Sequence, residues 1–109
     1  LEIYSKGMAS VVLTKEVLER FQATDQLASL VVSVPGTVEG ILAWSMYVEQ
    51  EDGTFRVHLR SKGPTVNHIA QAFGGGGHTL ACGIPSVTKS QILEVDAELK
   101  EAVKTFKKN

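Results

Sequence analysis

The sequence predicts a single domain of the α+β class, with α/β-like character, in which helices pack on a mixed β-sheet of four to five strands. Three observations lead to this prediction. β-branched runs of strand length alternate with segments whose apolar residues recur at helical spacing. The chain has 109 residues, 43% of them hydrophobic, which is enough for one buried core. No internal repeat or change of composition divides residues 1–109 into two units.

The first half of the chain is predicted to contain two strands and two helices. Met8–Leu13 is β-branched and apolar on both faces, as an interior strand would be. Thr14 is a suitable N-cap for a short helix over Lys15–Gln22. A second helix is expected over residues 24–32, and Val38–Val48 predicts a long, well-buried strand.

A β-hairpin is predicted next, with its turn at residues 51–53 (Glu-Asp-Gly) and its return strand over Thr54–Arg60. Because side chains alternate between the two faces of a strand, three apolar residues face one side and three basic residues face the other. A basic row of this kind is either a solvated surface or a platform for anions. The apolar residues are Phe55, Val57 and Leu59, and the basic ones are Arg56, His58 and Arg60.

A helix beginning at Pro64 is predicted from apolar residues at the i, i+3, i+4, i+7 spacing, and the glycine run Gly74–Gly77 ends it. We expect a short helical turn over His78–Cys82. Ile84–Val87 predicts an edge strand, since Pro85 disfavours a central position in a sheet. The apolar residues of the helix are Val66, Ile69, Ala70 and Phe73.

The last element is predicted to be an amphipathic helix that begins after Thr88. Thr88 and Gln91 have the spacing of a capping box, and lysines occur at the C-terminal end, where the helix dipole favours cations. The predicted order of elements is therefore β-α-α-β-β-α-α-β-α. The apolar stripe is Ile92, Val95, Leu99, Ala102, Val103 and Phe106, and the lysines are Lys104, Lys107 and Lys108.

The formal net charge of −1 hides an asymmetry. No Asp or Glu occurs from Gly53 to Leu93, and this stretch carries +4 while the other residues carry −5. Such an electropositive region suits an anionic ligand, with chance clustering of charges as the alternative. The acidic side chains elsewhere are scattered and are expected to face solvent: Glu16, Glu19, Glu51, Asp52, Glu94 and Glu98.

The stretch FGGGGHTLACG, Phe73–Gly83, is the strongest functional signal. If the glycines open a helical turn, backbone N–H groups and the helix dipole would favour a phosphate there. One glycine would suffice for a helix C-cap, so four favour a loop that lets the backbone contact a ligand. His78 would donate a hydrogen bond to a phosphoryl oxygen or serve as an acid, with an N-cap-like structural role as the alternative. His58 and His68 are weaker candidates.

The same region lacks the carboxylates that usually hold Mg²⁺ or Mn²⁺ beside a phosphate. We therefore expect half of an active site, which binds a phosphate and contains no metal ligand. The lone Cys82 excludes an internal disulfide and favours a reducing cytoplasm, and no apolar run has the length of a membrane span. A start at Leu1 is expected for a piece of a longer protein.

Arg60–Gly83, RSKGPTVNHIAQAFGGGGHTLACG, resembles the C-terminal, DHH-associated domain of the DHH phosphoesterase superfamily. The hallmark of that domain is a GGGH-type loop followed by a small residue and a glycine. The Arg-Ser-Lys strand end, the helix containing Ile69 and Ala70 and the glycine loop occur in the family's order. The preceding hairpin and the closing amphipathic helix also suit the family, so the resemblance covers nearly the whole chain. The most similar subgroup is the bacterial nanoRNases that also dephosphorylate 3′-phosphoadenosine 5′-phosphate.

The resemblance implies a two-lobed hydrolase whose N-terminal lobe, absent here, carries an Asp-His-His motif and binds Mn²⁺ or Mg²⁺. Residues 1–109 would be the substrate-binding lobe, inactive alone, for short oligoribonucleotides or small phosphorylated nucleotides. Oligomers could form through the full-length protein, and no membrane partner is expected. By position, the resemblance assigns phosphate or base contacts to Gly75, Gly76, Gly77 and His78, and a phosphate to Arg60, with Ser61 and Lys62 assisting.

Two residues depart from the family pattern. His58 stands where a small polar residue is expected, which could alter substrate choice, and Cys82 replaces a more usual Ala or Ser. Two other functions stay open: a non-catalytic RNA-binding or oligomerisation module, like those that close alanyl-tRNA synthetases, and a lobe of a cyclic-dinucleotide phosphodiesterase. Phe55, Phe73 and Phe106 follow core periodicity, which argues against an extended RNA-stacking surface.

Overall fold

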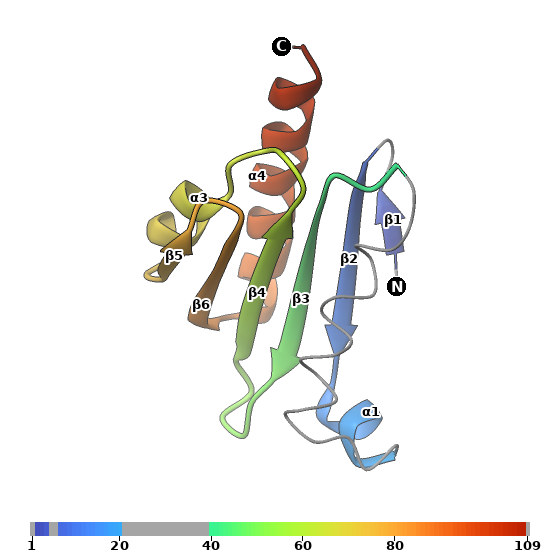
Figure 1. The fold of residues 1–109 in the computed structure, drawn as a ribbon. Coiled ribbons are helices and arrows are strands. Elements are labelled where there is room, and N and C mark those ends of the chain that lie inside the picture. The colour runs from blue at the N-terminus through green and yellow to red at the C-terminus, as the bar shows by residue number, and fades with distance from the viewer. Residues whose placement is uncertain (1, 5–6, 21–39, 109) are drawn as a thin grey trace.

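Six strands form one mixed sheet in the order β1-β2-β3-β4-β6-β5, seen in Figure 1 from the side opposite helices α3 and α4. This computed structural model describes residues 2–4, 7–20 and 40–108. The β2–β3 pair is parallel and the other pairs are antiparallel. The strands are β1 (Glu2–Tyr4), β2 (Met8–Leu13), β3 (Ala43–Glu49), β4 (Phe55–Ser61), β5 (Gly76–His78) and β6 (Ala81–Val87), and the helices are α1 (Lys15–Arg20), α3 (Asn67–Ala72) and α4 (Lys89–Lys108).

The predicted α+β class is confirmed, and the sheet has one strand more than the upper value of the predicted four to five, because the short edge strands β1 and β5 both belong to it. Each has three residues, too few for a period-two pattern to be recognised. The predicted strand Met8–Leu13 is β2, paired on both sides as expected of an interior strand. The helix predicted over residues 24–32 lies outside the described residues, as do the first two residues of the predicted strand Val38–Val48.

Strand β3 begins later than predicted because the chain turns before Ala43. Gly40 has φ +91°, and the N–H groups of Leu42 and Ala43 both donate to the carbonyl of Gly7, at 2.7 and 3.1 Å. These bonds hold the backbone of Leu42 outside the β-ladder. Thr14, the predicted N-cap of α1, accepts a hydrogen bond from the N–H of Val17 at 3.3 Å.

The predicted hairpin between β3 and β4 is confirmed. Gly53 adopts φ +87° in the turn, and the N–H of Gln50 donates to the carbonyl of Thr54 at 2.7 Å. The hydroxyl and the N–H of Thr54 both donate to Asp52. These hydrogen bonds lower the pKa of the Asp52 carboxyl, and the bond from the hydroxyl has the larger effect. The turn thus fixes the register that sends alternate β4 side chains to opposite faces.

Helices α3 and α4 lie behind the sheet in Figure 1 and cover one of its faces. The main core fills the space between these two helices and the sheet, as the sequence pattern predicts. None of the described helices is long and apolar enough to cross a membrane. The opposite face of β4, β6 and β5 is called the open face below. Residues buried in the main core include Val57, Leu59, Val66, Ile69, Ala70, Ile84, Val95, Leu99 and Val103.

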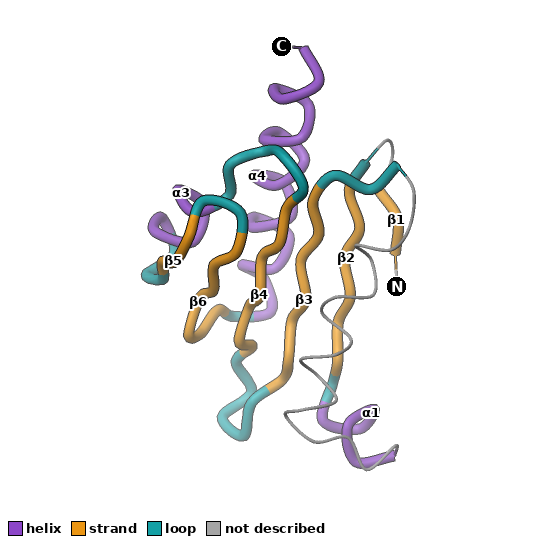
Figure 2. Tube along the Cα trace, in the orientation of Figure 1, coloured by secondary structure: helices purple, strands orange, loops and turns teal. Residues whose placement is uncertain are grey.

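The helical turn predicted over His78–Cys82 is wrong, because the chain forms a β-hairpin there. Strand β5 and strand β6 pair across a two-residue turn, with His78 opposite Ala81 (Figure 2). The turn is held by distant groups, since the N–H of Ser61 donates to the carbonyl of Leu80 and the N–H of Val66 to that of Thr79, both at 2.9 Å. These long-range bonds leave no local sequence signal.

The strand predicted over Ile84–Val87 is longer than expected and lies inside the sheet, between β4 and β5. Pro85 is tolerated there for two reasons. The β4–β6 register shifts between the Val57–Ile84 and Phe55–Val87 pairs, and β5 pairs with β6 no farther than Gly83. A proline without an N–H fits such an irregularity.

Helix α4 begins with the predicted capping box. The N–H of Gln91 donates to Thr88 Oγ1 at 3.3 Å, and the N–H of Thr88 donates to Gln91 Oε1 at 2.8 Å. The apolar stripe faces the core except at Phe106, which is 44% exposed and was predicted to be buried. Its ring lies instead against the backbone of Gly63, beyond the end of the sheet.

Thr88→Ala is expected to lower the free energy of unfolding by about 1 kcal/mol, because the first turn of α4 loses a hydrogen-bond acceptor. Urea denaturation would measure the change. The control is Glu94→Ala, an exposed position on the same helix, which should change stability by less than about 0.5 kcal/mol. Equal effects of the two substitutions would contradict a stabilising role for the cap.

Candidate functional site

Cross-strand register gathers the basic residues of β4 and the histidine of the glycine loop on the open face. Residues directly opposite each other in an antiparallel pair share a face of the sheet. Two rows therefore cross the sheet from β3 to β5, and their members on β4, β6 and β5 lie on the open face, whereas those on β3 are buried. The first row is Trp44, Arg60, Ala81 and His78, and the second is Met46, His58, Gly83 and Gly76.

Arg60 is held in place at the first row. Its Nη1 donates to the carbonyl of Leu59 at 2.9 Å and to that of Cys82 at 3.2 Å, so the guanidinium spans the β4–β6 pair. His78 is exposed on β5, two strand spacings away, or about 10 Å. Only the small side chain of Ala81 stands between them in the row. The structure thus brings Arg60 and His78 to the same face with space between them.

At three of the four positions in Gly74–Gly77, the fold itself requires a glycine. Gly74 has φ +89° and ends α3 in a Schellman arrangement, because its N–H donates to the carbonyl of Gln71 and that of Gly75 to the carbonyl of Ala70. A Cβ on Gly75 would collide with the Gly83 carbonyl and lie 2.8 Å from the Cα of Ile84. Gly77 has φ +140°, and its Cβ would lie 2.7 Å from the Cα of Cys82.

At position 76 the fold does not require a glycine. Its φ is not positive, and a Cβ there would meet nothing within 4 Å. It belongs to β5, which forms the edge of the sheet and has one strand neighbour, β6. An edge strand presents backbone donors and acceptors that no ladder uses. Gly76 is therefore the glycine whose missing side chain opens the surface.

An electropositive pocket of about 540 Å³ lies where the glycine run meets β4 and β6. Arg56 and His58 are its charged or titratable lining residues, and no carboxylate lines it. Burial lowers the pKa of His58, and the neighbouring charges of Arg60 and Arg56 lower it further. The described lining residues are Arg56, Val57, His58, Gly74, Gly75, Gly76, Gly83, Ile84 and Pro85.

The seven residues predicted for the site divide into three groups. Gly75 and Gly76 line the electropositive pocket, while Arg60, Gly77 and His78 flank it on β4 and β5. Ser61 and Lys62 follow at the end of β4. The hydroxyl of Ser61 is used within its own loop, since it donates to the carbonyl of Pro64 and accepts from the N–H of Gly63 at 3.0 Å.

Cys82 lies on the other side of the sheet from His78, because adjacent positions of a β-hairpin alternate faces. It is buried in the main core and is free, and burial raises the pKa of its thiol. Within the described residues, no group of three or more His, Cys, Asp or Glu side chains is placed to hold a metal ion. The chemistry available at the open face is therefore anion binding by cations and backbone amides.

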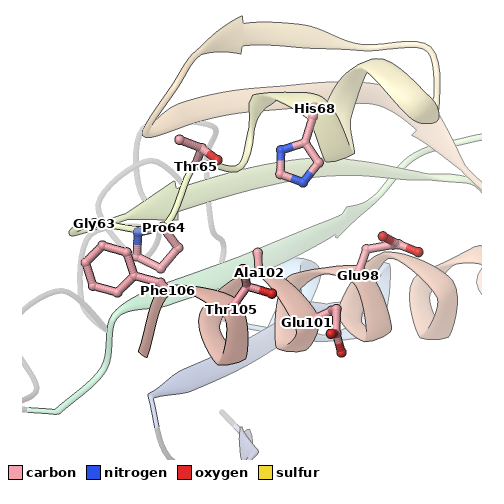
Figure 3. A pocket seen from close by; sticks show the side chains of 9 residues that line it. All are labelled: Gly63, Pro64, Thr65, His68, Glu98, Glu101, Ala102, Thr105 and Phe106. Atoms are coloured by element: carbon pink, nitrogen blue, oxygen red, sulfur yellow. The ribbon is translucent and has the colours of Figure 1, made fainter. Parts of the chain in front are cut away.

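Two other pockets are less suited to a phosphate, because carboxylates line them. One of about 450 Å³ lies between the Gly63–Thr65 loop, α3 and α4, with His68 on α3 and with Glu98 and Glu101 on α4 in its lining (Figure 3). Another, of about 890 Å³, lies beside the first turns of α4, with Glu49 and Asp96 in its lining. Negative charge in both would oppose an anionic ligand.

One buried carboxylate, that of Asp96, is not among the residues that the sequence predicts to be important. Asp96 is 4% exposed, and its Oδ1 accepts hydrogen bonds from Tyr47 Oη at 2.5 Å and from Ser45 Oγ at 2.8 Å. The acidic side chains that were predicted to face solvent are all exposed, as expected. The signal that could have found Asp96 is its position, since it lies on the apolar stripe of α4 between Val95 and Leu99.

The chain is similar in sequence to proteins of a known family. A family model described as the DHHA1 domain matches residues 7–106. A Streptococcus mutans protein named probable bifunctional oligoribonuclease and PAP phosphatase NrnA is 39% identical over 104 residues, and the Bacillus subtilis protein with that function in its name is 38% identical over 104 residues. Each alignment covers 95% of this chain and 34% or 33% of the relative, so the chain spans about a third of their length.

Two solved structures share the fold. An exopolyphosphatase-related protein from Bacteroides fragilis matches with a TM-score of 0.78 at 24% identity, over 97% of this chain and 31% of the other. A pGpG-specific phosphodiesterase from Vibrio cholerae matches with a TM-score of 0.60 at 11% identity, over 96% of this chain and 35% of the other. At such identities the likeness concerns the fold alone.

Proposed function

This chain belongs to the DHHA1 domain family, and we propose that it is the substrate-binding lobe of a metal-dependent phosphoesterase of the DHH type. The observation that supports the proposal best is the open face, where basic side chains of β4 lie beside the glycines Gly76 and Gly83. Among the described residues, no carboxylate lines the pocket there. The substrates we propose are short oligoribonucleotides and 3′-phosphoadenosine 5′-phosphate, in keeping with the names of the relatives.

Three kinds of group would hold a phosphate on this face. Arg60 supplies a guanidinium that its hydrogen bonds to Leu59 and Cys82 already orient, so little side-chain freedom is lost on binding. The edge strand β5 offers backbone N–H groups beside Gly76, and His78 offers an imidazole N–H. Charge-assisted hydrogen bonds of this kind bind phosphate oxygens strongly.

The described residues do not fit a catalytic metal site, so we assign Mn²⁺ or Mg²⁺ to a part of the parent protein outside this chain. The 109 residues alone should bind nucleotide without hydrolysing it. Turnover by the purified chain would contradict this division of the active site.

Arg60→Ala is expected to weaken binding of 3′-phosphoadenosine 5′-phosphate by about 10- to 100-fold, the loss of one or two charge-assisted hydrogen bonds. Isothermal titration calorimetry on the chain would measure it. Lys104→Ala is the matched control, because it removes one positive charge from an exposed position on α4, the helix on the opposite side of the sheet from the open face. An equal loss of affinity in both variants would show that the effect comes from net charge alone, and it would contradict a site at Arg60.

Nucleic-acid length distinguishes this proposal from an RNA-binding module. Among the aromatic residues whose side chains the structure describes, Phe106 alone is exposed, so the surface offers few rings on which bases could stack. A single phosphate pocket should bind a diribonucleotide and a long RNA with similar affinity per site. Much tighter binding of the long RNA, with a steep dependence on salt, would favour the RNA-binding alternative.

A further inference from the structure

His58 lies at the middle of the second row on the open face and lines the electropositive pocket. Along β4 its neighbours on the same face are Arg56 and Arg60. Across the sheet its register partners are Met46 on β3 and Gly83 on β6, and Gly76 follows on β5. The two glycines leave the surface beside the imidazole free of side chains.

We propose that His58 determines specificity by favouring dianionic phosphate groups, such as the terminal phosphomonoester of a nucleotide, over monoanionic phosphodiesters. The inference rests on the proposed function, because it concerns how the same pocket responds to the charge of a bound phosphate. Protonation of His58 would place three positive charges in a row on β4. A dianion offsets two of them and a phosphodiester offsets one, so the dianion favours the protonated imidazole more.

The free pocket keeps His58 neutral near pH 7. Burial and the two flanking arginines lower its pKa below the ordinary value of a histidine. The residues facing it from β3 and β6, Met46 and Gly83, carry no charge, and none of the described residues that line the pocket is a carboxylate that could stabilise an imidazolium. A bound dianion would therefore be the group that promotes protonation.

The direction of the pH dependence follows from linkage. A ligand that raises the pKa of His58 causes uptake of a proton in the interval between the free and the bound pKa. Affinity therefore rises as pH falls through that interval, and it is level above the bound value and below the free value. The unliganded domain behaves in the opposite way: because its His58 pKa is lowered, the domain loses stability as pH falls from about 6.5 towards the folded pKa.

The test uses adenosine 5′-monophosphate as the dianionic ligand and adenylyl-(3′→5′)-adenosine as the phosphodiester. NMR would follow the His58 imidazole, the amides of Gly76 and Gly83, and the phosphorus signal of the ligand between about pH 5.5 and pH 8, the range in which histidine titrates. The pKa of His58 should rise with the monophosphate and rise less with the phosphodiester. Calorimetry on wild type and on His58→Ser then measures affinity over the same range.

Replacing His58 by serine should reduce the preference for monophosphate over phosphodiester at about pH 6 by fivefold or more, a typical size for coupling between two sites. The ligand's own titration is common to both proteins and cancels in their ratio. His68→Ser is the matched control, because His68 is exposed on α3 and lies in a different pocket. It should leave the preference unchanged.

Each result decides between the two proposals. If the Gly76 and Gly83 amides shift with ligand while the pKa of His58 stays constant, the role of His58 is refuted and the phosphate site stands. An unchanged preference in His58→Ser has the same meaning. If neither the amides nor His58 respond to either ligand, the proposed function fails and the inference fails with it.

Discussion

Gly75→Ala is expected to destabilise the domain by about 3 kcal/mol or more, whereas Gly76→Ala should cost less than about 1 kcal/mol. The two positions are adjacent, and the chemical change is the same. A Cβ on Gly75 points into the backbone of β6, where it would meet the Gly83 carbonyl and the Cα of Ile84, and backbone can move only if the strands separate. A Cβ on Gly76 meets nothing within 4 Å.

Urea denaturation of the two variants measures the difference, and nucleotide binding to the folded variant adds a second readout. The methyl group of Gly76→Ala would project over the open face, so binding of 3′-phosphoadenosine 5′-phosphate should weaken severalfold while the fold is kept. Equal stability of the two variants would refute the close approach of the loop to β6. Unchanged binding by Gly76→Ala would refute the role of Gly76 as an open surface.

The sequence predicts those elements of the fold whose determinants are local. The β-branched run of β2, the alternation of β4 and the capping box of α4 each depend on neighbours a few residues away. Strands β5 and β6 depend on distant groups instead, because the turn at Thr79 and Leu80 is held by N–H groups of Ser61 and Val66. A local pattern could not distinguish that hairpin from a helical turn.

The candidate site shows the same division. Alternation in β4 correctly places Arg56, His58 and Arg60 on one face. Four consecutive glycines do not by themselves indicate a ligand-binding loop, because Gly74 and Gly77 adopt positive φ and Gly75 touches β6. The helix-dipole argument for phosphate binding does not apply, since the loop leads into a strand. The feature of the loop that still supports phosphate binding is the edge strand at Gly76, where no side chain covers the backbone.

Asp96→Ala is expected to lower the free energy of unfolding by about 2–4 kcal/mol, because it removes the carboxylate oxygen to which two buried hydroxyl groups donate. Tyr47 and Ser45 are both fully buried, and both donate to the same carboxylate oxygen, which joins α4 to β3. Ser10 on β2 extends this network, with its hydroxyl 3.2 Å from that of Ser45. The carboxylate thus connects the helix to two strands of the sheet.

Two comparisons of stability distinguish the loss of this hydrogen-bond network from the general effect of a substitution on α4. Asp96→Asn keeps an oxygen acceptor of the same shape and should lose less than Asp96→Ala, about 1 kcal/mol. Glu98→Ala, exposed two residues later, should be neutral within about 0.5 kcal/mol. In a double-mutant cycle, Tyr47→Phe should cost much less in the Asp96→Ala background than in wild type, because its hydroxyl no longer has this acceptor. Additive losses would show that the two side chains act independently and would refute the network.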